Sequence, residues 1–505
     1  MDPLEHHTLA PDVCFDGGDL DCGSGLLLLI RRHIDPMERG QILEIRSTEI
    51  SVDEDLPAWC RLTGNELVSW TRHGKQRSFL VCKGALTNRQ SAHIGTARAQ
   101  TVAHETKAVK IPFTLPRPAP APEIPPLSVM GIGSWPRPGW MLRAIHDHME
   151  GRLSEKEFQS AAKDAVRLAI DAQLRAGVDV VTDGEQRRDS YASFVGGILD
   201  NCQLIPLTDL FPLVDDPEEF EQELKALDVP AGEVRHPAVF GPLGRSRPLA
   251  VHELEFAKTL TAKPVKVALP GPYLLTRTMW MECVSDRAYE SREHLAEDIV
   301  RVLREELHFL LAGGAALVQF DEPVLSEVVF TGPKQARSFM CGALSEKRDA
   351  GHELAFAGEL INRVVEGLPA ERTAIHICRG NWTRDESAAL SGDYTPLLPL
   401  LKSLHVGTLF LELCTPRAGE MEVLRRLSEN YRIGVGIVNQ KLERVEPVEE
   451  IEARVREAIH MFGSDRVLFT PDCGFATFAD NPLASSRIAE EKLAAIVQAV
   501  QAAGR

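Results

Sequence analysis

Most of the chain alternates short runs of apolar, β-forming residues with long amphipathic helical patterns. A strand followed by a helix, repeated many times, is typical of a parallel sheet whose strands are joined by crossover helices. Eight such runs between residues 128 and 505 predict an α/β fold, a (β/α)8 TIM barrel with insertions that forms one large domain. The runs cover residues 128–132, 178–182, 265–269, 316–320, 373–377, 408–413, 433–437 and 467–469.

Several of these runs end in polar or glycine-rich segments. The carboxyl ends of barrel strands meet on one face, which is where active sites lie in such barrels. We therefore expect these segments to share one pocket. They are Gly133-Ser134, Asp183-Gly184-Glu185, Pro270-Gly271-Pro272, Asp321-Glu322-Pro323, His376 with Cys378, Glu412, Asn439, and Asp472-Cys473.

Four of the residues at these strand ends are of types that bind metals. His376 and Cys378 are two residues apart, so their side chains point the same way from a strand. Glu412 and Cys473 each follow another apolar run and are expected to reach the same place. A lone His-x-Cys pair is more often a packing feature, because buried cysteines behave mostly as small apolar residues. Nitrogen, sulfur and oxygen donors together suit Zn²⁺, so the sequence predicts a zinc site.

The barrel is preceded by a second predicted domain and a linker. Residues 10–86 read as strands and helices in the order βαβαββ, which predicts a small two-layer α/β sandwich. Residues 87–127 form the linker, because residues 114–126 are rich in proline and such tracts act as semi-rigid spacers. The third segment, residues 128–505, is the predicted barrel.

The composition excludes several classes of partner. The formal net charge of −17 argues against nucleic acid and anionic membranes, since both reward clustered Lys and Arg. No apolar run approaches membrane-spanning length. Ten cysteines scattered over 505 residues do not resemble a disulfide framework, so we expect a reducing, cytoplasmic setting.

The metal-ligand pattern resembles the zinc-binding signature of the cobalamin-independent methionine synthase (MetE) family. The resemblance rests on His-x-Cys, a Glu that ends a strand, and Pro471-Asp472-Cys473-Gly474, and it covers nearly all of the predicted barrel. It implies a (β/α)8 catalytic barrel in which His376, Cys378, Glu412 and Cys473 bind zinc. In that family the metal activates a thiol as the nucleophile for alkyl transfer.

The same resemblance implies contacts to an amino acid thiol substrate. Residues 130–136 look like the opening strand and turn that hold its carboxylate, which gives this role to Ile132, Gly133 and Ser134. Asp183-Gly184-Glu185 is similar to a His-Gly-Glu element whose Glu binds the amine. Gln319-Phe320-Asp321-Glu322-Pro323 resembles a Gln-Ile-Asp-Glu-Pro element whose Asp also holds the amine. The resemblance therefore assigns the amine to Glu185 and Asp321.

The methyl donor is less well defined by the motifs. Residues 269–272, followed by Trp280, are similar to the segment that lines the donor side in the family. The chain departs from the family where Asn439 replaces a common Asp and where Asn381-Trp382 replaces a cysteine-bearing continuation. Full-length members also carry a second barrel, whereas this chain has a small domain instead. These departures leave the donor, whether folate, corrinoid or another compound, open.

The small N-terminal domain resembles the TusA/SirA-like sulfur-carrier family. In that family the turn before the first helix carries a Cys-Pro-x-Pro motif, and here Cys22-Gly23-Ser24-Gly25 keeps the cysteine but has glycine at both proline positions. A thiol at a helix N-terminus is biased towards thiolate. The resemblance implies that Cys22 carries a persulfide and meets a sulfur-transfer partner. The alternative is a degenerate domain that only docks a partner or substrate.

The leading prediction is a Zn²⁺-dependent methyltransferase that methylates a small thiol, homocysteine by analogy, to give methionine. A second hypothesis keeps the thiol activation but changes the thiol or the electrophile, as in the epoxyalkane:coenzyme M transferases. A third, from another class, is a sulfur-relay protein whose barrel has lost catalysis and whose Cys22 carries sulfur. A small thiol and an alkyl donor are the expected ligands under the first two.

Overall fold

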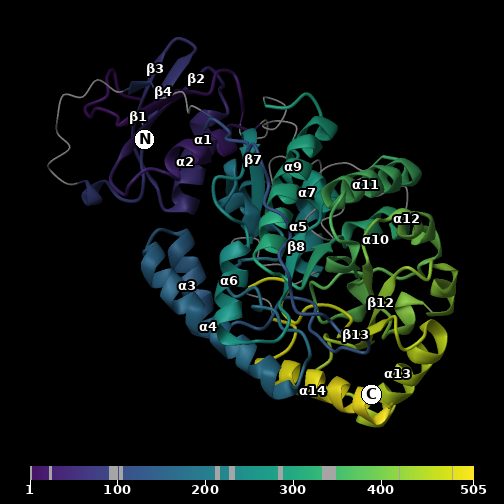
Figure 1. Ribbon diagram of the computed structural model, residues 1–505. Coiled ribbons are helices and arrows are strands. Elements are labelled where there is room, and N and C mark those ends of the chain that lie inside the picture. Colours follow the sequence, from purple (N-terminus) through teal and green to yellow (C-terminus); the bar gives the residue numbers. More distant parts are fainter. Residues whose placement is uncertain are drawn as a thin grey trace.

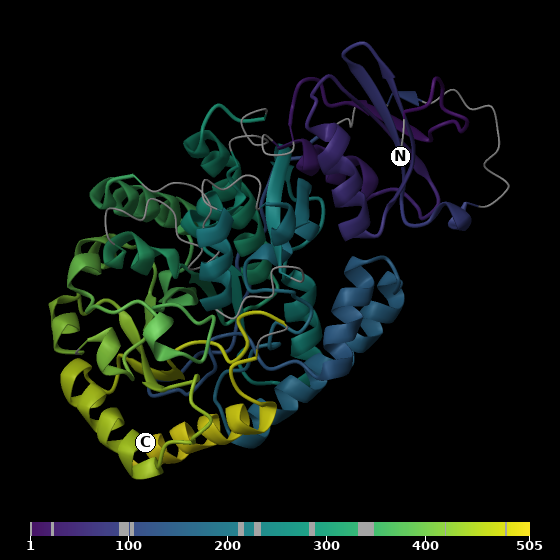
Figure 2. The same cartoon turned by 180° about the vertical axis from the view of Figure 1, so that it is seen from behind.

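The computed structural model contains a small N-terminal unit beside a larger, helix-covered barrel (Figure 1). Figure 2 shows the same two units from behind, with the C-terminal helix on the far side of the barrel from the small unit. The structure describes residues 3–21, 25–89, 100–101, 106–210, 217–226, 234–281, 288–331, 348–419, 421–479 and 482–504.

The larger unit is a ring of eight parallel segments. Six are strands in the order β13-β12-β11-β10-β9-β8, and each pairs with its neighbour in parallel. The other two, residues 129–130 and 180–181, join β13 to β8 through single parallel pairs, Val129 with Phe469, Met130 with Val180, and Val181 with Val265. The predicted (β/α)8 architecture is therefore confirmed, although the first two predicted strands are single pairs. The strands are β8 Lys266–Pro270, β9 Leu317–Asp321, β10 Thr373–Ile377, β11 Thr408–Leu411, β12 Arg432–Val438 and β13 Val467–Pro471.

The inside of the ring is packed, as in other barrels of this type. Seven side chains from different segments form a separate inner core, namely Met130, Ile132, Val180, Leu317, Ala374, Phe410 and Leu468. Gly434 of β12 makes room for this packing, because a Cβ there would lie 2.0 Å from the Phe410 ring. The ring is thus a rigid base that fixes the residues following each strand.

Helices cover the outside of the barrel (Figure 1). The bounds of the long helix α4 follow from its capping residues. Ser154 and Glu157 form a capping box at its beginning, and Gly177 ends it in the left-handed conformation. The barrel helices are α3 Gly139–Met149, α4 Glu155–Ala176, α5 Pro217–Ala226, α6 Val251–Leu260, α7 Pro272–Met279, α9 Arg292–Ala312, α10 Val324–Phe330, α11 Ala350–Val365, α12 Leu398–Ser403, α13 Val448–Phe462 and α14 Ser486–Ala502.

The N-terminal unit has the predicted βαβαββ order. Its sheet runs β3-β4-β2-β1-β5, with β1 parallel to both β2 and β5, and β4 antiparallel to both β2 and β3. The apolar side chains of both helices pack in the same core as the sheet residues Phe15, Leu43 and Phe79. The elements are β1 Val13–Asp16, α1 Leu27–Ile34, β2 Ile42–Ser47, α2 Val52–Thr63, β3 Glu66–His73, β4 Gln76–Cys82 and β5 Gln100–Thr101.

The N-terminal unit contacts the barrel at a hairpin that the sequence pattern did not predict. Strands β6 Asp200–Pro206 and β7 Arg235–Gly244 form it, in the insertion before β8. Arg31 of α1 pairs with Asp209 at 2.5 Å, and Gln203 of β6 donates to Asp35 at 2.6 Å. These bonds place the two units side by side, as both views show (Figures 1 and 2).

The proline-rich tract packs along the barrel. Ala119 donates its N–H to Leu311 and accepts from Arg372, and Pro125 accepts from Arg432. These partners lie at the amino ends of the strands, opposite the face where the predicted site lies. Among the described residues, no helix is long and apolar enough to cross a membrane.

Candidate metal centre and substrate pocket

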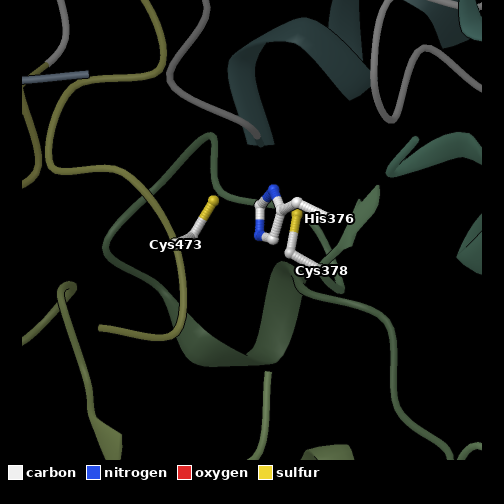
Figure 3. A group of neighbouring side chains, drawn as sticks. All are labelled: His376, Cys378 and Cys473. Carbon is white, nitrogen blue, oxygen red and sulfur yellow. The ribbon is translucent and has the colours of Figure 1, made fainter. Parts of the chain in front are cut away.

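Three of the four predicted metal ligands come together at the carboxyl ends of the strands. His376 lies in β10, Cys378 directly follows that strand, and Cys473 follows β13. One ligand atom from each lies within 4.8 Å of those of the other two, and all three side chains are buried. Figure 3 shows that Cys473 approaches from a separate loop and faces the other two.

The chemistry of this group fits zinc. A hydrogen bond from the Cys473 thiol lowers the pKa of Cys378 to about 7, and the same bond raises the pKa of Cys473. Cys378 therefore begins to lose its proton near neutral pH, and a bound metal ion would displace the proton that remains on Cys473. One imidazole and two thiolates at this spacing are a common zinc donor set.

Asp321 orients the imidazole of His376. Its Oδ1 lies 2.9 Å from His376 Nδ1 and accepts a second hydrogen bond from Gln319 at 2.7 Å. Burial lowers the pKa of His376, but the bond with Asp321 and the charge of Cys378 outweigh this effect, so the pKa is raised. A carboxylate on the second ring nitrogen is the usual support of a zinc-binding histidine. The nitrogen that would bind the metal is then Nε2, which lies 3.4 Å from the backbone carbonyl of Asp472 in this structure.

Glu412 is fully buried beside the three ligands but is not part of their group among the described residues. Its Oε2 accepts the backbone N–H of Arg379 at 2.7 Å, and its Oε1 lies 2.7 Å from the guanidinium of Arg417. Its charge nevertheless acts on both thiols. Ligation of zinc by Glu412 thus requires release from Arg417 and stays a prediction.

A pocket of about 40 Å³ opens on the three ligands. Seven of the predicted metal and substrate residues line it: Ile132, Ser134, Glu185, Asp321, His376, Cys378 and Cys473. The expectation that the strand ends share one pocket is met for these residues.

Glu185 is held in the pocket wall in a strained conformation. Its φ of 55° lies in the left-handed region, which residues with side chains rarely adopt, and such strain concentrates at functional sites. Its Oε2 is buried and has no hydrogen-bond partner among the described residues. Burial raises the pKa of Glu185 to about 7. Gly133 permits this placement, because a Cβ there would lie 2.1 Å from Glu185 Oε1.

The loops around the pocket are joined by Asn381, to which sequence reasoning assigned no role, and by Ser134, which it assigned to the substrate carboxylate. Asn381 donates to the carbonyl of Gly474 at 2.8 Å and to Thr477 at 2.9 Å, and it accepts from Gln440 at 2.6 Å. Ser134 accepts from the backbone of Ala476. Asn381 thus joins the loop that carries Cys378 to the loop that carries Cys473. In the sequence, its position three residues after a predicted metal ligand is the feature that could have indicated this role.

Among the described residues, the predicted site residues Gly133, Glu412 and Trp280 do not line this pocket. Trp280, which follows α7, is half-buried against the main core and is not among the described residues that line the pocket. Its role on the donor side stays a prediction. Cys22 lies outside the described residues.

A family model described as the catalytic domain of the cobalamin-independent synthase matches residues 127–205, 223–354 and 375–503. The chain belongs to this family. The matched segments contain all the predicted metal and substrate residues of the barrel. They begin at Leu127, so the N-terminal unit lies outside the cobalamin-independent synthase domain.

Similar proteins carry the name methionine synthase. One from Saccharolobus solfataricus is 26% identical over 377 residues, which cover 74% of this chain and 94% of that protein. Another, from Sulfurisphaera tokodaii, is 26% identical over 353 residues, which cover 70% of this chain and 87% of that protein.

Solved structures share the fold of the cobalamin-independent synthase domain. A B12-independent methionine synthase from Shewanella sp. W3-18-1, in complex with selenomethionine, aligns with a TM-score of 0.56 at 23% identity over 75% of this chain and 97% of that chain. A putative vitamin-B12-independent methionine synthase from Listeria monocytogenes aligns with a TM-score of 0.54 at 17% identity, over 75% of this chain and 99% of that chain.

Proposed function

We propose that the chain is a zinc-dependent methyltransferase that moves a methyl group from a donor to the thiol of homocysteine and so forms methionine. The observation that carries this proposal is one small pocket that combines the His376, Cys378 and Cys473 donors with the buried carboxylates of Glu185 and Asp321. Family membership and the names of the relatives support it.

His376, Cys378 and Cys473 would hold the zinc, with Glu412 as the fourth ligand. When bound, zinc would lower the pKa of a coordinated substrate thiol and keep it as the reactive thiolate at neutral pH. Glu412 is suited to leave and return, because Arg417 and the N–H of Arg379 lie ready to receive its carboxylate. Exchange of this carboxylate between two partners would open a position for the substrate sulfur.

The pocket's own residues would fix the rest of homocysteine. Glu185 and Asp321 both line the pocket, and their carboxylates would accept hydrogen bonds from the substrate ammonium. Ser134, with the backbone of Ile132 and Gly133, would hold the carboxylate, which is on the same carbon as the ammonium. Fixing both groups directs the thiol towards His376 and the two cysteines, which lowers the entropic part of the barrier.

A direct assay tests this function. Purified, zinc-loaded protein is incubated with homocysteine and, in separate reactions, methyltetrahydrofolate or methylcobalamin, and methionine is measured by mass spectrometry. We expect methionine with at least one donor and none from protein stripped of zinc. If neither donor yields methionine, assays with coenzyme M and an epoxide distinguish the alternative alkyl transfer.

For the N-terminal unit we propose a sulfur-carrier-like role in a reducing compartment such as the cytoplasm. The βαβαββ order and the position of Cys22 shortly before α1 support it. Incubation with a cysteine desulfurase and L-cysteine, whose sulfur the desulfurase would pass on as a persulfide, followed by mass spectrometry would detect a persulfide on Cys22, and Cys22→Ser is the control. Absence of the persulfide would leave docking as the role of this unit.

A further inference from the structure

A cleft of about 930 Å³ lies between the N-terminal unit and the barrel. One wall comes from α1, the end of α2 and the residues after β4. The other comes from the α3–α4 turn, residues 187–189 and the β6–β7 hairpin. Its size lies in the range of small-molecule sites, which form preferentially at domain interfaces.

The described lining of this cleft carries seven Lys and Arg residues but five Asp and Glu residues. Three of those carboxylates are paired with arginines in the lining: Asp35 with Arg31, which also pairs with Asp209, Glu150 with Arg235, and Glu253 with Arg188. Glu155 lies 3.3 Å from the imidazole of His148, which is cationic only when protonated. The formal net charge of the chain is −17, whereas the described lining of this cleft has more cationic than anionic side chains.

The remaining cations are held by backbone carbonyls or by weak contacts. Lys83 donates to the carbonyl of Met37 at 2.7 Å, and Arg247 to that of Gly197 at 2.7 Å. Among the described residues Arg39 forms no ion pair. The Arg187 side chain is 5% exposed, its Nη1 has no hydrogen-bond partner in the described part of the chain, and its nearest carboxylate oxygen lies 3.8 Å away on Asp183. Carbonyls leave the positive charge in place, so it is available to a ligand.

We infer that this cleft binds a small, multiply anionic molecule with an apolar body. The apolar body is indicated by Ile145, Met149, Phe158 and Phe194, which line the cleft between the cationic groups. About a third of the described lining, 11 of 32 residues, comes from outside the cobalamin-independent synthase domain, so the site belongs to the combination of the two units in this chain.

The cleft lies next to the metal pocket. Arg187 and Arg188 follow Glu185 in the same loop, and the charge of Arg188 lowers the pKa of Glu185 against the effect of burial. A narrow space of about 20 Å³ lies between the cleft and the metal pocket and shares lining residues with both. It shares Arg235 with the cleft, and Tyr191 and Trp382 with the metal pocket. The anion in the cleft is therefore either the charged end of the methyl donor or a separate effector.

The test measures binding with 1,3,6-naphthalenetrisulfonate, an aromatic trianion that does not chelate zinc. Isothermal titration calorimetry of the zinc-loaded full chain is expected to give saturable binding that weakens with added salt. The double variant Arg39→Ser/Arg247→Ser, one exposed arginine from each unit, should bind about tenfold or more weakly, since each charged contact contributes roughly 1 kcal/mol. Arg487→Ser, which removes an exposed arginine from α14, should bind like wild type.

No saturable binding to wild type below about 1 mM, or equal affinity of the double variant, would overturn the inference. Because the readout is binding, it does not depend on methyl transfer. Inhibition kinetics then identify the source of the anion: competition with the methyl donor assigns the cleft to the donor, and a change in rate without competition assigns it to an effector.

Discussion

Oδ1 of Asp321 lies 2.9 Å from Nδ1 of His376, so one carboxylate both faces the substrate pocket and fixes a metal ligand. In Asp321→Asn the amide would support the imidazole less well and bind the substrate ammonium less strongly. We expect zinc affinity to fall about 10- to 100-fold and the homocysteine KM to rise. Titration against a chromophoric chelator measures the first, and Glu185→Gln is the control that should raise KM while keeping zinc. Unchanged zinc affinity in Asp321→Asn would show that the bond does not support the metal.

Cys473 is predicted to be essential for the metal, whereas Cys414 is not. Cys414 lies two residues after Glu412, but its sulfur accepts a hydrogen bond from Arg454 at 3.1 Å. Metal analysis should find about one zinc per chain in wild type and in Cys414→Ser, and much less in Cys473→Ser. Equal zinc in all three proteins would refute the site.

The ion pair of Glu412 and Arg417 is predicted to control how readily Glu412 leaves the metal. Arg417→Met removes the guanidinium that holds Oε1 at 2.7 Å, so Glu412 would stay on the metal more of the time. We expect tighter zinc binding and a homocysteine KM raised about three- to tenfold, because the substrate sulfur must displace a more firmly bound ligand. Arg384→Met, which breaks an exposed pair with Glu443, is the control. Weaker zinc binding in Arg417→Met would contradict the exchange.

The sequence predicted the barrel and most of the pocket because both depend on local patterns. The strand order and the residues at the strand ends follow from apolar runs and their spacing, and His376, Cys378 and Cys473 meet as expected. The bond between Asp321 and His376 was not predictable, since it joins residues of neighbouring strands whose side-chain directions the pattern does not specify. The β6–β7 hairpin was missed because its residues include prolines and polar side chains in place of regular alternation.

Glu185 should make substrate binding depend on pH. Burial raises the pKa of its carboxyl to about 7, so the ionised form that binds an ammonium is lost as the pH falls below 7. We expect kcat/KM for homocysteine to fall below pH 7 and this limb of the profile to disappear in Glu185→Gln. The raised pKa also means that ionisation opposes folding above pH 7. Glu185→Gln should therefore be more stable than wild type at pH 8, by up to about 3 kcal/mol, and less so at pH 5. Urea unfolding at both pH values checks the sign, and an advantage that is larger at pH 5 would contradict it.

Lys266 is a buried cation below the pocket, and its charge is predicted to keep the acidic residues above it ionised. Its Nζ donates to Gln319 at 2.7 Å and lies 4.4 Å from the centre of the Phe410 ring, and Gln319 in turn donates to Asp321. Burial lowers the pKa of Lys266 to about 7, against the attraction of Asp321 and Glu185. In Lys266→Met, a substitution of similar length, the pKa of Glu185 should rise further and the homocysteine KM should increase about tenfold at pH 7, with recovery at pH 8.5. Lys258→Met, which removes an exposed ammonium from α6, should leave KM unchanged at both pH values. A KM increase in Lys266→Met that is the same at pH 7 and pH 8.5 would show that the lysine acts through packing and not through its charge.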